Sequence, residues 1–202
     1  MNRYIITTIT LGLVLLVPDA RAAAPSDVIH EAIDILTEGL DERREEFSTD
    51  KDALYSFIDG ILLPRFDRQF AASAVLTKHW RTATDEQKAR FVEAFYITLV
   101  HRYSDGLLEF DTDRIEIMPY KGDARKRTTE VKTRVRLDDG TRIPVHYTLV
   151  NREDQWRMFD VKIEGVSYVI NYRKELDAEI RASSLERVIE RLETDAGIIS
   201  HE

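Results

Sequence analysis

The chain has 202 residues, no cysteine, and 29 Lys and Arg against 37 Asp and Glu, which gives a formal net charge of −8. This acidic balance argues against charge-driven binding to nucleic acid or to an anionic membrane leaflet. Because no disulfide can form, the fold must be stabilised by a hydrophobic core, and about 180 residues suffice to build one as a single domain.

The N-terminal segment has the pattern of an export signal. Arg3 precedes an apolar run from Ile5 to Val17, and Ala20-Arg21-Ala22 is a small-x-small cleavage site. The run has about thirteen residues, whereas roughly twenty are needed to span a bilayer. We interpret residues 1–22 as a cleaved signal peptide and residues 23–202 as one domain located in the bacterial periplasm. The absence of cysteine excludes a lipid-anchored lipoprotein.

Hydrophobic periodicity predicts that the mature chain begins with helices. Three are expected over about 26–46, 51–63 and 67–76, the second ended by Pro64. The capping box Thr84-Asp85-Glu86-Gln87 opens a longer helix that extends to about Leu108. Its apolar face is wide and aromatic, formed by Phe91, Phe95, Leu99, Tyr103 and Leu107 at i+4 spacing. Such a stripe is more typical of a packed core than of a ligand cavity, so alone it does not decide function.

From Arg114 onward the apolar period changes from 3.6 to 2, which predicts a sheet. Alternation over 115–117, 130–137, 143–149 and 155–163, with turns at 138–140 and 151–154, predicts four antiparallel strands in a meander. A sheet with one polar face needs a helical layer on the other, and we expect the aromatic helix from Thr84 to supply it. Pro144 and Gly165 permit bending. A flat sheet would pack solidly on the helix, whereas a curved one would leave a cavity in a cone-shaped α+β fold.

Two amphipathic helices are expected to close the chain. Ser167 is placed to cap the first, and Ser183 with Glu186 forms a capping box for the second. We expect their apolar faces to pack onto the domain's own sheet, with binding of a partner protein as the alternative.

The sequence contains no strong catalytic or metal-binding motif. The five histidines are scattered with no pair at i+4, and Ser167 lacks the Gly-x-Ser-x-Gly context of a hydrolase nucleophile. Asp160 and Glu164 are the two carboxylates that could act as a base at a sheet edge. An isomerase or hydratase that uses a cone-shaped pocket therefore stays open as an alternative.

Four segments are informative together: Leu62-Leu63-Pro64, the Trp80–Thr84 run that leads into the long helix, Asp160-Val161-Lys162-Ile163-Glu164-Gly165-Val166-Ser167, and Asn171-Tyr172-Arg173. They resemble the MlaC family of periplasmic phospholipid-binding proteins, also described as toluene-tolerance or ABC-transporter auxiliary proteins. The Glu-Gly-Val-Ser segment after an aromatic-Asp strand is the specific part. Thr77 stands where glycine is frequent in the family, and Leu176 where phenylalanine is common.

The resemblance implies an α+β fold in which a curved antiparallel four-stranded sheet packs against a helical layer, cone-like (NTF2-like) with a central apolar pocket. It implies a shuttle that carries glycerophospholipids between the outer and inner membranes and so maintains outer-membrane lipid asymmetry, with no enzymatic activity and no cofactor or metal. The implied partners are an outer-membrane lipoprotein complex and an inner-membrane ABC transporter with its substrate-binding ring. We expect a monomer.

Strand parity and the helical stripe select the residues that we predict to contact the acyl chains. Each buried CH₂ is worth about 0.8 kcal/mol, so the site must be apolar, while the head group can stay in water. The predicted lipid-binding residues are Phe91, Phe95, Leu99, Tyr103, Val135, Val145, Tyr147, Leu149, Phe159, Val161 and Val166.

Overall fold

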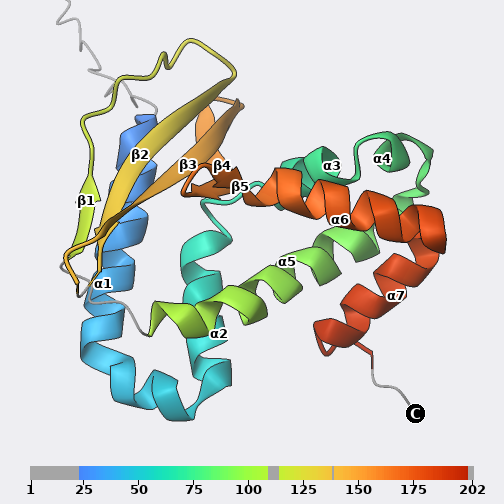
Figure 1. Cartoon of the computed structure of the whole chain (residues 1–202), viewed down its shortest axis with the longest axis horizontal. Helices are drawn as coiled ribbons and strands as arrows, with labels where there is room; N and C mark the ends of the chain where they lie inside the picture. The colour runs from blue at the N-terminus through green and yellow to red at the C-terminus, as the bar shows by residue number, and fades with distance from the viewer. Residues whose placement is uncertain (1–22, 109–113, 138, 200–202) are drawn as a thin grey trace, which may run out of the picture.

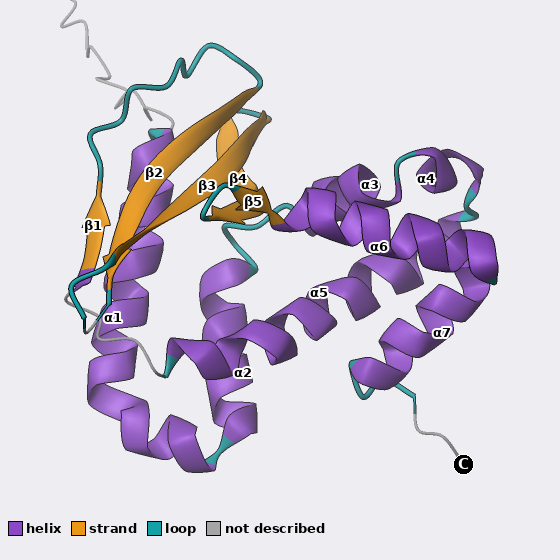
Figure 2. Cartoon of the chain, in the orientation of Figure 1, coloured by secondary structure: helices purple, strands orange, loops and turns teal. Residues whose placement is uncertain are grey.

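The computed structural model describes residues 23–108, 114–137 and 139–199, so the predicted signal peptide lies outside the described residues. A five-stranded sheet lies at one side of the molecule, and several helices gather beside it (Figures 1 and 2). The elements in chain order are α1 (Pro25–Thr49), α2 (Lys51–Leu62), α3 (Arg68–Leu76), α4 (Lys78–Thr82), α5 (Asp85–Leu107), β1 (Ile115–Ile117), β2 (Thr128–Arg136), β3 (Arg142–Arg152), β4 (Gln155–Ile163), β5 (Val166–Ser167), α6 (Tyr168–Ala182) and α7 (Leu185–Asp195).

The sheet confirms the predicted meander and extends it. All neighbouring strands pair antiparallel in the order β1-β2-β3-β4-β5, and the fifth strand, two residues long, was not predicted. Glu153 and Asp154 have φ values of 55° and 60°, the left-handed pair that a two-residue hairpin between β3 and β4 requires. A bulge between Thr148 and Leu149 shifts the register with β4, which bends the sheet.

The helix that covers the sheet is α1, not the aromatic α5 that the sequence led us to expect. Val28, Ile29 and Ile33 of α1 form a buried cluster with residues of β2, β3 and β4. The stripe of α5 is instead occupied by other helices, because Phe91 and Phe95 lie in a core shared with α3, α6 and α7. The expectation was wrong because periodicity shows that a face is buried but not which partner buries it.

The connection between α2 and α3 protects the open edge of β4. The amide of Met158 donates to the Arg65 carbonyl, and the amide of Asp67 donates to the Met158 carbonyl, each at 2.7 Å. β5 pairs only with the last residues of β4. The segment 65–67 therefore satisfies backbone groups that would otherwise form an unpaired strand edge.

The C-terminal helices pack mainly on α3 and α5, because their apolar residues lie in the core shared by these helices, and α6 also contacts the end of β4. Ser167 caps α6 as predicted, accepting from the Ile170 amide at 3.1 Å. The cap of α7 is Ser184 and not Ser183: the Ser184 hydroxyl accepts from the Arg187 amide, whereas Ser183 ends α6. Sequence spacing alone could not separate two adjacent serines.

Candidate functional site

The two faces of the sheet differ sharply in polarity. We call the face that α1 covers the inner face. The register places Val131, Tyr147 and Val161 in one row across it, and Thr133, Val145 and Ile163 in the next. The alternate positions form the outer face, where the rows are Lys132, His146 and Lys162, and Glu130, Thr148 and Asp160. The predicted strand parity is thus confirmed for β2, β3 and the end of β4 from Asp160 onward.

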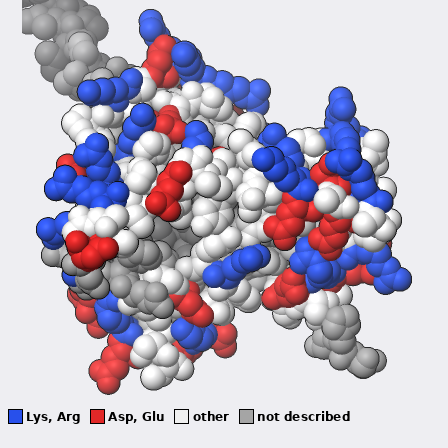
Figure 3. Space-filling model, viewed as in Figure 1, with Lys and Arg blue, Asp and Glu red and all other residues white. Residues whose placement is uncertain are grey.

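The middle of the outer face has the character of a solvated surface, whereas Val150 and Asp160 toward its other end are buried. In Figure 1 β2 crosses in front of α1, so the view looks onto this face, and Figure 3 shows charged side chains over the strands. Glu130 is at its centre, with the Lys162 ammonium at 2.7 Å and His146 Nδ1 at 3.3 Å. This face offers no apolar surface of the kind that an acyl chain needs.

The inner face divides into a packed half and an unpacked half. Under α1, Val131 and Leu149 are fully buried and Trp156 and Met158 are nearly so. Beyond α1, five apolar residues are only half-buried, and none of the core clusters among the described residues includes them. We call these five the unpacked half: Val135, Ile143, Val145, Val161 and Ile163. Half-buried aliphatic side chains that share a face but pack on no core provide a surface for an apolar ligand.

Tyr147 marks the boundary between the two halves. Its side chain contacts the buried cluster under α1, yet it keeps part of its surface accessible. Desolvation raises the pKa of its phenol, and the nearby Thr133 hydroxyl partly opposes this shift. The phenol is therefore neutral at physiological pH and adds no charge to the inner face.

The predicted lipid-binding residues fall into three groups in the structure. Val135, Val145, Tyr147 and Val161 share the inner face as predicted. Phe91, Phe95 and Leu149 are fully packed in cores, and Phe159 and Leu99 pack against the helical core, Phe159 with its ring on Phe70 at 4.7 Å. Tyr103 and Val166 are exposed, at 39% and 59%.

Two residues of the unpacked half, Ile143 and Ile163, are missing from the predicted set. Both continue the i, i+2 alternation from Val145 and Val161, so the pattern that selected those two could have found them. The bulge in β4 could not be predicted in the same way. It pairs Met158 with Leu149 and leaves Phe159 out of register, so Met158 rather than Phe159 continues the inner face.

Three tyrosines lie where the inner face meets the helices. Val166 of β5 pairs with Ile163, and α6 begins two residues later. The Tyr168 ring is perpendicular to the Tyr103 ring with centroids 5.0 Å apart, and the Tyr103 and Tyr172 hydroxyls are 3.1 Å apart. We call Tyr103, Tyr168 and Tyr172 the tyrosine cluster. It connects α5 to the start of α6 beside the exposed edge of the sheet.

Asp160, one of the two candidate bases, has a structural role in this geometry. Its carboxylate accepts from the Ser167 hydroxyl at 2.6 Å and from the Val169 amide at 3.0 Å, and it is buried. It thus anchors the N-terminus of α6 to β4. The other candidate, Glu164, is exposed in the turn after β4. Neither carboxylate lies in the inner-face rows.

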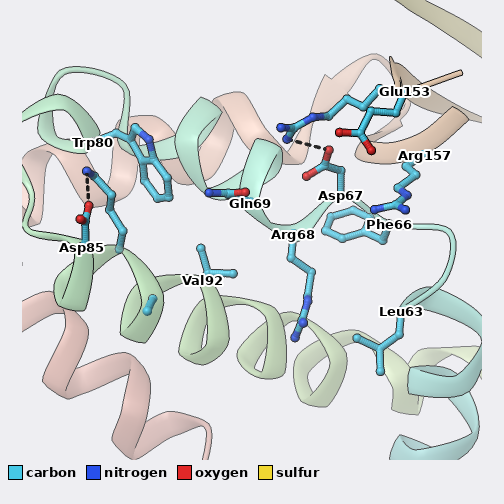
Figure 4. A pocket seen from close by; sticks show the side chains of 13 residues that line it. Leu63, Phe66, Asp67, Arg68, Gln69, Trp80, Asp85, Val92, Glu153 and Arg157 are labelled. Atoms are coloured by element: carbon cyan, nitrogen blue, oxygen red, sulfur yellow. Dashed lines mark hydrogen bonds and ion pairs between the residues drawn. The ribbon is translucent and has the colours of Figure 1, made fainter. Parts of the chain in front are cut away.

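A separate open cavity of about 720 Å³ lies between α3, α4, α5, the α2–α3 connection and the β3–β4 hairpin. It is lined by Leu63, Phe66, Trp80 and Val92 together with charged residues (Figure 4). Its charges largely neutralise one another: Arg152 pairs with Asp67 at 3.2 Å, and Lys88 pairs with Asp85 at 3.2 Å. None of the predicted lipid-binding residues lines it. A cavity with this many ion pairs is poorly suited to hold acyl chains, because the chains would desolvate the charges.

Among the described residues, no group of three or more His, Cys, Asp or Glu is arranged to hold a metal ion. Within the same ranges, no helix is both long and apolar enough to cross a membrane.

The sequence of this chain matches a known family. A family model described as MlaC protein matches residues 30–194, which is most of the chain. The chain belongs to the MlaC family. This MlaC-family chain is 32% identical over 147 residues to the toluene tolerance protein ttg2D of Pseudomonas putida, covering 72% of this chain and 68% of that protein. It is 20% identical over 197 residues to the intermembrane phospholipid transport system binding protein MlaC of Haemophilus influenzae, covering 96% and 92% of the two chains.

The fold of this MlaC-family protein is also that of a solved structure. A phospholipid-binding protein from Ralstonia solanacearum, solved in complex with a phospholipid, superposes with a TM-score of 0.77 at 16% identity, covering 87% of this chain and 98% of that chain. This match confirms the predicted α+β fold, with five strands in place of four.

Proposed function

We propose that this protein binds a phospholipid against the unpacked half of the inner face and carries it as part of an intermembrane phospholipid transport system. The observation that carries the proposal is the set of half-buried aliphatic residues, Val135, Ile143, Val145, Val161 and Ile163, which belong to no core cluster of the described residues. Each acyl CH₂ group that leaves water for this surface contributes about 0.8 kcal/mol of binding free energy, so the surface can bind a poorly soluble acyl chain.

The relatives support the same function. The Haemophilus protein is named as a binding protein of a phospholipid transport system, and the Ralstonia structure contains a phospholipid. By extension, the cargo is a glycerophospholipid moved between the outer and inner membranes to maintain outer-membrane lipid asymmetry. The protein would act in the periplasm as a monomer. Its partners would be an outer-membrane lipoprotein complex and an inner-membrane ABC transporter with its substrate-binding ring.

The two alternatives have less support. An isomerase or hydratase needs a base that faces the pocket, but Asp160 is engaged at the start of α6 and Glu164 points from an exposed turn. An interaction module needs a free apolar helix face, but the apolar faces of α6 and α7 are buried in the helical core. We therefore propose no enzymatic activity, with phospholipid as cargo rather than cofactor.

Organic-solvent extraction of the purified protein followed by mass spectrometry tests the proposal. We expect glycerophospholipid at close to one molecule per chain. Protein that carries no lipid, and that takes up none when incubated with phospholipid vesicles, would contradict it.

A change at Asp160 tests the enzyme alternative. Asp160→Asn keeps the size of the side chain but weakens the bond with Ser167, so we expect about 1–2 kcal/mol less stability against urea and an unchanged lipid content. Turnover of a lipid by the native protein that Asp160→Asn abolishes would favour the enzyme instead.

A further inference from the structure

Arg102 lies beside the tyrosine cluster and is poorly neutralised. Its guanidinium donates one long hydrogen bond, 3.5 Å to the Tyr172 hydroxyl, and it forms no ion pair among the described residues. The pKa of Arg102 is raised by the neighbouring Tyr172 and Tyr103 and, less strongly, by Glu175. The side chain is exposed, so most of its donors remain free for a ligand.

The tyrosine cluster supplies further donors. Desolvation and the hydrogen bond to Tyr172 raise the pKa of Tyr103, and desolvation also raises that of Tyr168. Both phenols therefore keep their protons at neutral pH and can donate to an anion. Tyr103 is 39% exposed, and its hydroxyl lies 3.1 Å from that of Tyr172.

These donors lie at the border of the unpacked half. Ile163 pairs with Val166, which is 59% exposed, and Tyr168 follows Val166 by two residues. Tyr103 contacts the ring of Tyr168, and Arg102 is the neighbour of Tyr103 on α5. An apolar surface and a cationic group with phenolic donors thus meet at one edge of the sheet. This combination of groups complements an amphiphile with apolar chains and an anionic head group.

We propose that Arg102 and the Tyr103 hydroxyl bind the phosphate of the lipid whose acyl chains lie on the unpacked half. The inference rests on the proposed function. A guanidinium binds phosphate oxygens through two parallel N–H donors, a geometry that fits a phosphodiester better than an uncharged head. The site thus selects phospholipids over phosphate-free lipids with the same chains. A free phosphate lacks the chains and gains nothing from the apolar residues.

Competition between two lipids tests this selection. Delipidated protein is mixed with equal amounts of dioleoyl phosphatidylethanolamine and dioleoylglycerol, and native mass spectrometry measures which lipid is bound. We expect the native protein to prefer the phospholipid. Loss of one charge-assisted hydrogen-bond pair should reduce that preference by about tenfold in Arg102→Gln while dioleoylglycerol binding stays unchanged.

Two further variants sharpen the result. Tyr103→Phe keeps the ring contact with Tyr168 and removes only the hydroxyl, so we expect a smaller loss of preference, about threefold. As a control, Arg81→Gln removes the same charge from an exposed residue of α4. Its neighbour Trp80 contacts Lys88 near the start of α5, whereas Arg102 lies near the end of that helix. Arg81→Gln should keep the full preference for the phospholipid over dioleoylglycerol.

These experiments distinguish the phosphate site at Arg102 from the proposed binding of lipid on the inner face. An unchanged preference in Arg102→Gln, or an equal loss of both lipids, would overturn the phosphate site while leaving the lipid site intact. Native protein that binds neither lipid would contradict the proposed function itself. Inorganic phosphate that raises the melting temperature of the native protein but not of Arg102→Gln would identify a free-anion site and would also overturn the inference.

Discussion

Thr77 is a single residue at which the backbone conflicts with the side chain. It joins α3 to α4 with φ 48° and ψ −105°, in a region that a β-branched residue rarely adopts. The sequence resemblance led us to expect a glycine at this position, and the backbone gives a physical reason for one: glycine has no Cβ to clash there.

Thr77→Gly should therefore stabilise the protein. Relief of the strained conformation outweighs the added freedom of the unfolded chain, and we expect the free energy of unfolding to rise by about 1 kcal/mol. Urea denaturation measures the change. The control Thr37→Gly, made inside α1, should lower stability by roughly 0.5 kcal/mol. A loss of stability in Thr77→Gly would show that the threonine is not strained.

At the scale of elements, the central feature is that α1 packs on the sheet. Ile29 is 1% exposed and lies in the buried cluster with Val131 and Leu149. Ile29→Ala should cost about 2–5 kcal/mol of unfolding free energy, because it opens a cavity between the helix and the strands. Ile35→Ala, on the same helix but 37% exposed, should cost less than about 1 kcal/mol. Equal costs in urea denaturation would mean that α1 is not held on the sheet through this face.

Ion pairs also join the strands across the outer face, with Glu130 at their centre. Desolvation opposes ionisation of Glu130, but the hydrogen bond from Lys162 and the charges of Lys162, His146 and Lys132 together hold its pKa below the usual value. Because the folded-state pKa is lowered, the resulting stability is present above the unfolded pKa and is lost as the pH falls through the folded one.

Glu130→Gln should therefore be less stable than the native protein at pH 7 by up to about 1 kcal/mol, a modest value because the group is partly exposed. The difference should shrink as the pH falls below about 4. Urea titrations at several pH values measure it, with Glu164→Gln in an exposed turn as the control. A difference that persists unchanged in acid would exclude an electrostatic origin.

At the scale of the whole molecule, the longer elements were predictable, whereas the short α4 and β5 were missed and the assembly of the elements was less predictable. Caps such as Thr84 and Ser167 and the alternation in β2 to β4 determine local structure, so boundaries and strand parity were predicted well. The partner of each apolar face depends on contacts far apart in the sequence, which is why α1 rather than α5 covers the sheet.

Contacts between residues far apart in the sequence also limited the prediction of the lipid-binding residues. Parity correctly placed Val135, Val145, Tyr147 and Val161 on one face, but the choice of Phe91 and Phe95 depended on the wrong helix pairing. A bulge depends on register and not on residue type, so the displacement of Phe159 had no signal in the sequence.

A pair of adjacent substitutions on β3 tests whether a phospholipid lies against the unpacked half of the inner face. Val145→Arg places a charge among the half-buried aliphatic residues, whereas His146→Arg places the same charge on the outer face, beside Glu130. Circular dichroism verifies that both variants fold, and mass spectrometry of solvent extracts measures the lipid bound per chain.

We predict that Val145→Arg retains at most about a tenth of the native lipid content, because burying an unpaired charge under an acyl chain costs several kcal/mol. His146→Arg should retain all of it. Full lipid content in a folded Val145→Arg protein would contradict the account.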